Sequence, residues 1–273
     1  VGIVSRMLQL QQLDRPLNVR QHNIFDTHSH YDDSKFDPDR EELLNNLQSQ
    51  GVSLVVSCGC DIDSTQFNFD LAQKYDYMYF AAGFHPENLK GATLDDLKII
   101  ERFAKNDKCV AIGEIGLDYY WMDSSKDEQK KFFKAQIDLA KKLDMPIIVH
   151  DRDAHGDTLD ILRETKPKGV VHCFSGSKEM AREIIKLGMY IGLNGVVTFN
   201  NARKSLEVAK EIPIERLVLE TDCPYLAPTP MRGKRNDSHY IPYIAEKIGS
   251  LLGIDAQELL DITNENAKRL YNL

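Results

Sequence analysis

The sequence lacks the marks of several large classes of protein. No apolar run in the 273 residues approaches the roughly 18 residues that a membrane span needs, and residues 1–23 contain no secretory h-region. The five cysteines are odd in number and include no CxxC pair, which is typical of reduced thiols and not of a disulfide framework. We therefore expect a cytoplasmic protein with no membrane partner.

Glycine motifs that bind nucleotide phosphates are also absent. No GxGxxG or GxxxxGK[ST] follows a strand-like run, so a nucleotide-binding fold gains no support. The chain has 34 Lys and Arg against 42 Asp and Glu, a net charge of −8. Because an acidic chain does not bind nucleic acid through bulk charge, an anionic substrate would need a local positive site, which bound divalent cations can provide.

Short apolar runs alternate with amphipathic stretches from residue 24 onward. Eight of the runs are typical of strands, at residues 24–30, 53–57, 77–84, 110–117, 146–150, 169–172, 190–197 and 216–222. Helical stretches lie between them, and two more follow the last strand. Mostly apolar strands are covered on both faces, so this order predicts a single (β/α)8 TIM barrel over residues 24–273, with an open doubly wound sheet as the alternative. Residues 1–23 are set aside as an N-terminal extension or a cloning remnant.

The first predicted strand ends in two histidines. His28 and His30 are two residues apart, so a strand directs both to the same face, about 7 Å apart. Two imidazoles placed in this way can share one metal ion.

Other predicted strands also end in a histidine or a carboxylate. Beyond the first pair these residues are His85, Glu114, His150, His172 and Asp222. The C-terminal ends of all strands converge on one face of a barrel, where such enzymes place their sites. These residue types suit a two-metal site.

The strand order suggests how the ligands divide. His28, His30 and Asp222 belong to the first and last strands, which are neighbours in a closed barrel, and they are expected to hold one ion. His150 and His172 belong to adjacent strands and are expected to hold the second. Glu114, on a middle strand, is the predicted bridge between the two ions.

Three further groups admit two interpretations. Glu220 shares a face with Asp222 and either orients a ligand or forms an ion pair inside the barrel. His85 fits neither ligand group, so we assign it to substrate phosphate or proton transfer, with packing as the alternative. Cys58 and Cys60 are interpreted as buried thiols in preference to ligands of a soft metal.

Two segments after strands are candidates for substrate contact. The basic loop Arg232-Gly-Lys234-Arg235 follows the last strand and is predicted to bind the DNA backbone, unless it is only a solvated loop. The residues at 119–121, Tyr-Tyr-Trp, follow the fourth strand and either stack on unpaired bases or form the packed root of their loop.

The chain resembles the TatD family of metal-dependent deoxyribonucleases. The resemblance rests on Phe25-Asp-Thr-His-Ser-His30, Gly83-Phe-His-Pro86, Gly113-Glu-Ile-Gly-Leu-Asp118, Pro146-Ile-Ile-Val-His150, His172-Cys-Phe-Ser-Gly176, Leu219-Glu-Thr-Asp222 and Pro224-Tyr-Leu-Ala-Pro228. It implies metal ligands at His28, His30, Glu114, His150, His172 and Asp222, the set reached above from strand ends. It also implies magnesium or manganese for activity, while the ligand types admit zinc.

The hypothesis is hydrolysis of DNA phosphodiester bonds, exonucleolytic on single strands, with Asp222 and Glu114 as the catalytic carboxylates. Two divalent cations activate the water, and Asp222 orients it and accepts its proton. DNA is the expected partner, and no obligatory protein partner is evident. One alternative is an ester or amide hydrolase with the same site, such as a D-aminoacyl-tRNA deacylase. The other is a non-catalytic binding protein stabilised by metal.

Overall fold

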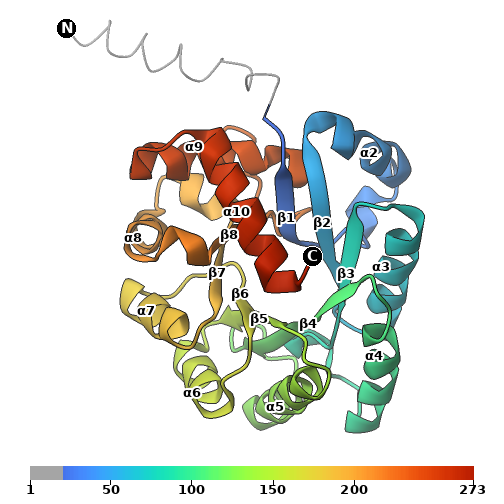
Figure 1. Ribbon diagram of the computed structural model, residues 1–273. Coiled ribbons are helices and arrows are strands. Elements are labelled where there is room, and N and C mark those ends of the chain that lie inside the picture. Colours follow the sequence, from blue (N-terminus) through green and yellow to red (C-terminus); the bar gives the residue numbers. More distant parts are fainter. Residues whose placement is uncertain (1–20) are drawn as a thin grey trace, which may run out of the picture.

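Eight parallel strands pair in sequence order, β1 to β8, in the computed structural model, which describes residues 21–273 (Figure 1). The strands are β1 Ile24–Ser29, β2 Val52–Cys58, β3 Met78–Ala82, β4 Cys109–Asp118, β5 Ile147–Arg152, β6 Gly169–Val171, β7 Tyr190–Leu193 and β8 Leu217–Leu219. A parallel bridge between Ser29 and Cys223 joins the first strand to the chain that follows the last. This arrangement confirms the (β/α)8 barrel and excludes the open doubly wound sheet. Of the predicted N-terminal extension, residues 1–20 lie outside the described residues.

A ring of helices covers the outer face of the strands (Figure 1). The helices are α2 Arg40–Leu47, α3 Ile62–Lys74, α4 Leu97–Ala104, α5 Lys126–Lys142, α6 His155–Thr165, α7 Lys178–Lys186, α8 Arg203–Glu211, α9 Ile241–Leu252 and α10 Ala256–Tyr271. Side-chain caps fix the N-termini of two of these helices. Ser177 accepts a hydrogen bond from the Met180 N–H before α7, and Asp255 accepts one from the Gln257 N–H before α10.

The seventh and eighth strands end three or more residues earlier than expected. The seventh ends at Leu193, because the side chain of Asn194 accepts a hydrogen bond from the Val196 N–H and starts a 3-10 helix at Gly195–Thr198. The eighth ends at Leu219, and the chain then turns through Asp222, whose φ is 59°. Side chains of Asn and Asp offer the backbone a local alternative to strand pairing, which apolar periodicity does not reveal.

The barrel interior is filled by small and branched side chains. They form a cluster that includes Val56, Ala111 and Ile148, and the end of α10 joins it through Leu270 and Tyr271. Figure 1 shows α10 lying across the barrel. The Tyr271 hydroxyl donates a hydrogen bond to the carbonyl of Thr27 at 2.9 Å. The filled interior leaves the strand ends on the other side to carry the polar residues.

A buried aspartate connects β1 to the chain beyond β8. Asp26 is fully buried and accepts hydrogen bonds from the backbone N–H and the hydroxyl of Thr221, at 3.0 and 2.7 Å, and from the Ser238 hydroxyl at 2.7 Å. Burial raises the pKa of Asp26 to about 7 although these hydrogen bonds act to lower it. Asp26 thus helps to hold the barrel closed beside the predicted metal site.

We predict that two substitutions of Asp26 differ in their effect on the free energy of unfolding. Asp26→Ala leaves buried donors unpaired and should lower the free energy of unfolding by about 1–3 kcal/mol, measured by urea denaturation. Asp26→Asn keeps the shape and removes the charge. Because the pKa is higher in the folded than in the unfolded chain, wild-type stability from this group is lost as the pH rises toward and past 7. Asp26→Asn should therefore match or exceed the wild type at pH 8, and an equal loss in both variants would contradict this account.

Candidate metal centre

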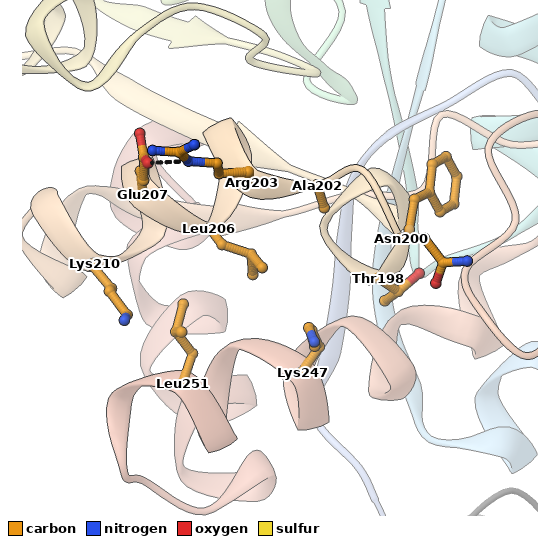
Figure 2. A pocket seen from close by; sticks show the side chains of 10 residues that line it. Thr198, Asn200, Ala202, Arg203, Leu206, Glu207, Lys210, Lys247 and Leu251 are labelled. Carbon is orange, nitrogen blue, oxygen red and sulfur yellow. Dashed lines mark hydrogen bonds and ion pairs between the residues drawn. The ribbon is translucent and has the colours of Figure 1, made fainter.

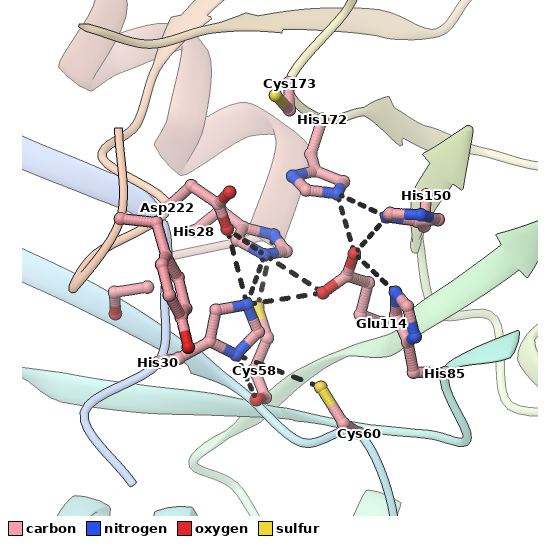
Figure 3. A network of polar contacts seen from close by, with 12 residues as sticks. His28, His30, Cys58, Cys60, His85, Glu114, His150, His172, Cys173 and Asp222 are labelled. Atoms are coloured by element: carbon pink, nitrogen blue, oxygen red, sulfur yellow. Dashed lines mark hydrogen bonds and ion pairs between the residues drawn. The ribbon is translucent and has the colours of Figure 1, made fainter. Parts of the chain in front are cut away.

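Glu114 on β4 is the central carboxylate at the barrel mouth, and it is 2% exposed. Its Oε1 lies 2.7 Å from His172 Nε2 and 2.8 Å from His150 Nδ1. Its Oε2 lies 3.2 Å from His28 Nε2 and 3.3 Å from His30 Nε2. Each oxygen of this carboxylate therefore faces one of the two predicted ligand pairs (Figure 3).

The first predicted ligand group is assembled from both ends of the barrel sequence. The Nε2 atoms of His28 and His30 lie 3.0 Å apart, and Asp222 Oδ1 lies 3.6 and 3.4 Å from them. The Asp222 N–H donates to the carbonyl of His28 at 2.9 Å, which sets the loop after β8 beside β1. The structure thus brings these three residues together as the strand order predicted.

The second predicted group lies directly beside the first. His172 Nε2 is 3.4 Å from His150 Nδ1, and the ring of His172 stacks on that of His28 with centroids 3.8 Å apart. All six predicted ligands therefore occupy one continuous cluster around Glu114 (Figure 3).

The chemistry of this cluster fits divalent cations. In two groups, His28–His30–Asp222 and His28–Glu114–His172, the ligand atoms lie within 4.8 Å of one another. Imidazole nitrogens and carboxylate oxygens are ligands for zinc and manganese, and carboxylates suit magnesium. Within residues 21–273 no lysine or arginine forms an ion pair with Glu114 or Asp222. The partners of these two buried carboxylates are imidazoles, which in their neutral form are themselves metal ligands.

The carboxylates are held in the charged form. Burial acts to raise the pKa of Glu114, but His172, His28 and His85 outweigh it and hold the pKa well below its ordinary value. Burial also acts to raise the pKa of Asp222, and the hydrogen bond from His30, with other imidazoles, lowers it overall. Both groups are therefore ionised at neutral pH, as metal ligands must be.

Three of the imidazoles contact another polar group through their second ring nitrogen. His150 Nε2 lies 2.9 Å from Asp118 Oδ2 at the end of β4. His30 Nδ1 lies 3.2 Å from the carbonyl of Cys58, and His28 Nδ1 lies 3.4 Å from the Sγ of the same cysteine. Such contacts fix the orientation and tautomer of a ligand ring.

Glu220 lies beside the fourth imidazole, that of His172. Its Oε1 lies 3.6 Å from His172 Nδ1 and accepts hydrogen bonds from the Cys173 N–H at 2.6 Å and the Asn194 side chain at 3.2 Å. A Cβ at Gly192 would lie 2.4 Å from Glu220 Oε2, so only glycine leaves room for this carboxylate. Within the described residues His172 Nδ1 has no hydrogen-bond partner, and its contact with Glu220 is an ion-pair distance, so both interpretations of Glu220 stay predictions.

Cys58, the last residue of β2, and Cys60, two residues later, lie beside the imidazoles. Cys58 is fully buried, and Cys60 Sγ lies 3.9 Å from His30 Nδ1. Cys60, His30 and Glu114 are also close enough together to share an ion. Burial raises the pKa of Cys60 to about 12, so the thiol stays protonated, which agrees with the interpretation of buried thiols.

His85 lies beside the cluster. Its Nδ1 accepts from the Glu87 N–H at 3.1 Å, so the ring proton is on Nε2, which lies 3.4 Å from Glu114 Oε1. Burial, together with His150, lowers the pKa of His85 to about 4 and keeps the ring neutral. His85, Glu114 and His150 also lie close enough together to share an ion, so the assignment of His85 to the substrate stays a prediction.

The basic loop differs from its expected form. Arg235 forms a two-pronged ion pair with Asp39, at 2.6 and 2.7 Å, and its guanidinium lies 4.8 Å from the ring centroid of Phe36. The Arg235 guanidinium is thus engaged in contacts that hold the loop in place. The structure therefore gives no support to a substrate contact from Arg235. Arg232 lies 3.7 Å from the ring centroid of Phe199, and both Arg232 and Lys234 are exposed, so their predicted role stays a prediction.

Sequence reasoning missed two acidic residues at the mouth. Asp118 lies four residues after Glu114 on β4, an even spacing that directs both to the same face and could have revealed it. Glu87 lies close enough to Asp118 and His150 to form a further candidate group, and burial, with Asp118, raises the pKa of Glu87 to about 7. Glu87 follows β3 in the short 3-10 helix Pro86–Asn88, which is too short to show a periodic pattern.

A separate surface pocket of about 540 Å³ lies between α8 and α9 (Figure 2). Leu206 and Leu251 line it together with Arg203, Lys210 and Lys247. It contains no histidine, cysteine or aspartate, and none of the clustered residues around Glu114 lines it. The metal chemistry therefore belongs to the barrel mouth.

Residues 25–272 match the family model described as TatD related DNase. The chain belongs to the TatD family. It is 44% identical to the uncharacterized metal-dependent hydrolase YabD of Bacillus subtilis over 253 residues, which cover 92% of this chain and 99% of that protein. It is 35% identical to the 3'-5' ssDNA/RNA exonuclease TatD of Pectobacterium parmentieri, over 92% of this chain and all of that protein.

Solved structures agree with this membership. The TatD homolog YJJV from Escherichia coli superposes with a TM-score of 0.84 at 29% identity, over 93% of this chain and 100% of that chain. The resemblance read from the motifs is thus confirmed, and the chain is a metal-dependent hydrolase of the TatD family. Among residues 21–273 we find no helix with the length and hydropathy to cross a lipid bilayer.

We predict that Glu220→Gln weakens metal binding by about 10- to 100-fold, the usual effect of losing a group that orients a ligand. Glutamine can still accept from the Cys173 N–H, so the loop keeps its shape while the charge facing His172 is lost. Calorimetric titration of metal-stripped protein with manganese measures the affinity. Glu265→Gln, on the outer face of α10, is the control and should bind like the wild type. Unchanged affinity in Glu220→Gln would leave Glu220 only a role in loop structure.

Proposed function

We propose that the chain is a metal-dependent deoxyribonuclease that removes nucleotides from single-stranded DNA. The observation that carries the proposal is the carboxylate of Glu114 lying between two groups of imidazoles, with Asp222 beside one of them. The name of the Pectobacterium relative, an exonuclease acting from 3' to 5', supports this substrate and polarity.

The proposed ligands for two divalent cations are His28, His30, Glu114, His150, His172 and Asp222. When bound, magnesium or manganese, or zinc as a compatible alternative, supplies positive charge that favours hydroxide over water and stabilises the charge developing on the phosphoryl oxygens.

Asp222 is the proposed proton acceptor. Its Oδ1 faces the imidazoles of His28 and His30, and its side chain is 19% exposed against 3% for Glu114, so it is the more open of the two carboxylates. Asp222 orients the attacking water and takes its proton as the water oxygen bonds to phosphorus. The bond from phosphorus to the leaving oxygen then breaks, and that oxygen receives a proton.

His85 is the proposed donor on the substrate side. Its neutral ring holds the proton on Nε2 at the edge of the cluster, so it can donate a hydrogen bond to a phosphoryl oxygen or to the leaving oxygen. Arg232 and Lys234, exposed after β8, are proposed to contact the DNA backbone more distantly. We propose a cytoplasmic location and no obligatory protein partner.

We predict metal-dependent, stepwise shortening of a single-stranded DNA oligomer. Metal-stripped protein is reloaded with magnesium, manganese or zinc, and oligomers labelled at the 5' or the 3' end are followed on a gel. A ladder from the 5'-labelled strand, with immediate release of label from the 3'-labelled strand, is the expected result. Asp222→Asn should slow the reaction by about 10²–10⁴-fold, since it removes the proton acceptor. Glu114→Gln should abolish it together with metal binding.

The control for both variants is Glu265→Gln. It removes one exposed carboxylate on α10, outside the ligand cluster, and should cleave DNA at the wild-type rate. Intact DNA with every metal would reject the nuclease proposal. The same preparations would then be tested on aminoacyl esters and amides, which the site could also hydrolyse.

A further inference from the structure

Two exposed aromatic rings and one arginine meet beside the metal centre. Tyr120 and Trp121 follow β4, and each is 55% exposed. The guanidinium of Arg152, the last residue of β5, lies 4.1 Å from the ring centroid of Tyr120 and 5.7 Å from that of Trp121. The two rings pack edge to face with centroids 4.9 Å apart. We call these three residues the aromatic platform.

The platform has unused binding capacity. Tyr120 and Trp121 are the two most exposed large hydrophobic side chains of the described residues. Among the ion pairs and side-chain hydrogen bonds within residues 21–273, none involves the guanidinium of Arg152. A positive charge without a carboxylate partner, lying on open aromatic faces, suits a ligand that has both an anionic group and a flat ring.

The platform is attached rigidly to the predicted metal ligands. Asp118 Oδ1 accepts hydrogen bonds from the backbone N–H groups of Tyr120 and Trp121, both at 2.9 Å, while its Oδ2 lies 2.9 Å from His150 Nε2. Arg152 follows His150 by two residues on β5, so the strand directs both to the same face about 7 Å apart. One carboxylate and one strand therefore fix the platform relative to the reacting centre.

The neighbouring Tyr119 is different. Its hydroxyl donates to Asp157 at 2.6 Å, and Lys126 lies 4.2 Å from its ring centroid. Tyr119 is thus the packed root of the loop, and the two following aromatic residues are free to contact a ligand.

We propose that the aromatic platform binds the unpaired nucleotide next to the scissile phosphate. A base stacks on Trp121 or Tyr120, and Arg152 pairs with the adjoining phosphate. The nature of the ligand rests on the proposed nuclease function. Because a base inside a duplex already stacks on its neighbours, the platform selects single strands and frayed ends.

Trp121 is the only tryptophan in the chain, so its fluorescence reports on the platform alone. Magnesium-loaded protein is titrated with a phosphorothioate-linked octamer of thymidine, which resists hydrolysis. We expect saturable quenching by the octamer and none by an abasic oligomer of the same length and charge. Tyr120→Leu should raise Kd at least about fivefold, the lower end of the effect of losing a stacked base. Arg152→Ala should raise Kd about tenfold.

Arg216→Ala is the matched control. Arg216 also lies on an aromatic ring, 4.9 Å from the centroid of Tyr190, but it precedes β8 and so lies at the opposite end of the barrel. The Arg216→Ala substitution removes the same charge as Arg152→Ala and should leave the Kd for the octamer unchanged. The proposal is overturned if the octamer binds without quenching or does not bind. It is also overturned if the abasic oligomer quenches equally, or if Arg216→Ala weakens binding as much as Arg152→Ala.

The gel assay on the same preparation separates the two proposals. Quenching without DNA cleavage would support the aromatic platform and reject the nuclease function. Cleavage without quenching would support the nuclease function and reject the platform.

Discussion

The buried carboxylate of Glu114 is the constraint on which the rest of the site depends. Five imidazoles approach its two oxygens within 3.4 Å, and they come from β1, the segment after β3, β5 and the segment after β6. An isolated charge at this depth would strongly oppose folding, so the surrounding imidazoles, and any cation they bind, are part of the stability of the barrel mouth. A closed parallel barrel brings ends of strands so distant in sequence to one point, which explains why one fold dictates both the ligand set and its geometry.

Close approach of backbone to backbone is the second requirement. A Cβ at Gly113, immediately before Glu114, would lie 2.7 Å from the Cβ of Ile148, and a Cβ at Gly83 would lie 2.9 Å from a methyl group of Ile115. Glycine at these positions lets β3, β4 and β5 pack tightly enough for the imidazoles to reach the carboxylate. The same reasoning applies to Gly192, where the missing side chain makes room for Glu220. Core packing and ligand geometry are therefore not independent.

Parallel strand ends determine which of the predicted site residues lie close together, while their roles stay predictions. His28, His150 and Asp222 could be grouped from strand order alone, because a barrel has a single face for all its C-terminal strand ends. Features that depend on one local or one distant side chain were not predictable. The seventh strand ends early because Asn194 accepts a hydrogen bond from the Val196 N–H, and Arg235 forms an ion pair with Asp39, nearly 200 residues earlier. Neither partner is implied by hydrophobic periodicity.

The net negative charge of the chain affects how a polyanion could approach the barrel mouth. With a net charge of −8, the surface as a whole repels a polyanion, so long non-specific contact with duplex DNA is disfavoured. Under the proposed function, attraction would come from cations bound by the ligand cluster and from the guanidinium of Arg152, which lies on the rings of Tyr120 and Trp121. Asp118 connects the ligand cluster to the aromatic platform, since one of its oxygens faces His150 and the other accepts a hydrogen bond from the Trp121 N–H. Under the proposed nuclease function, little general affinity for nucleic acid and two adjacent local contacts would favour engaging one nucleotide at a time, at the end of a single strand.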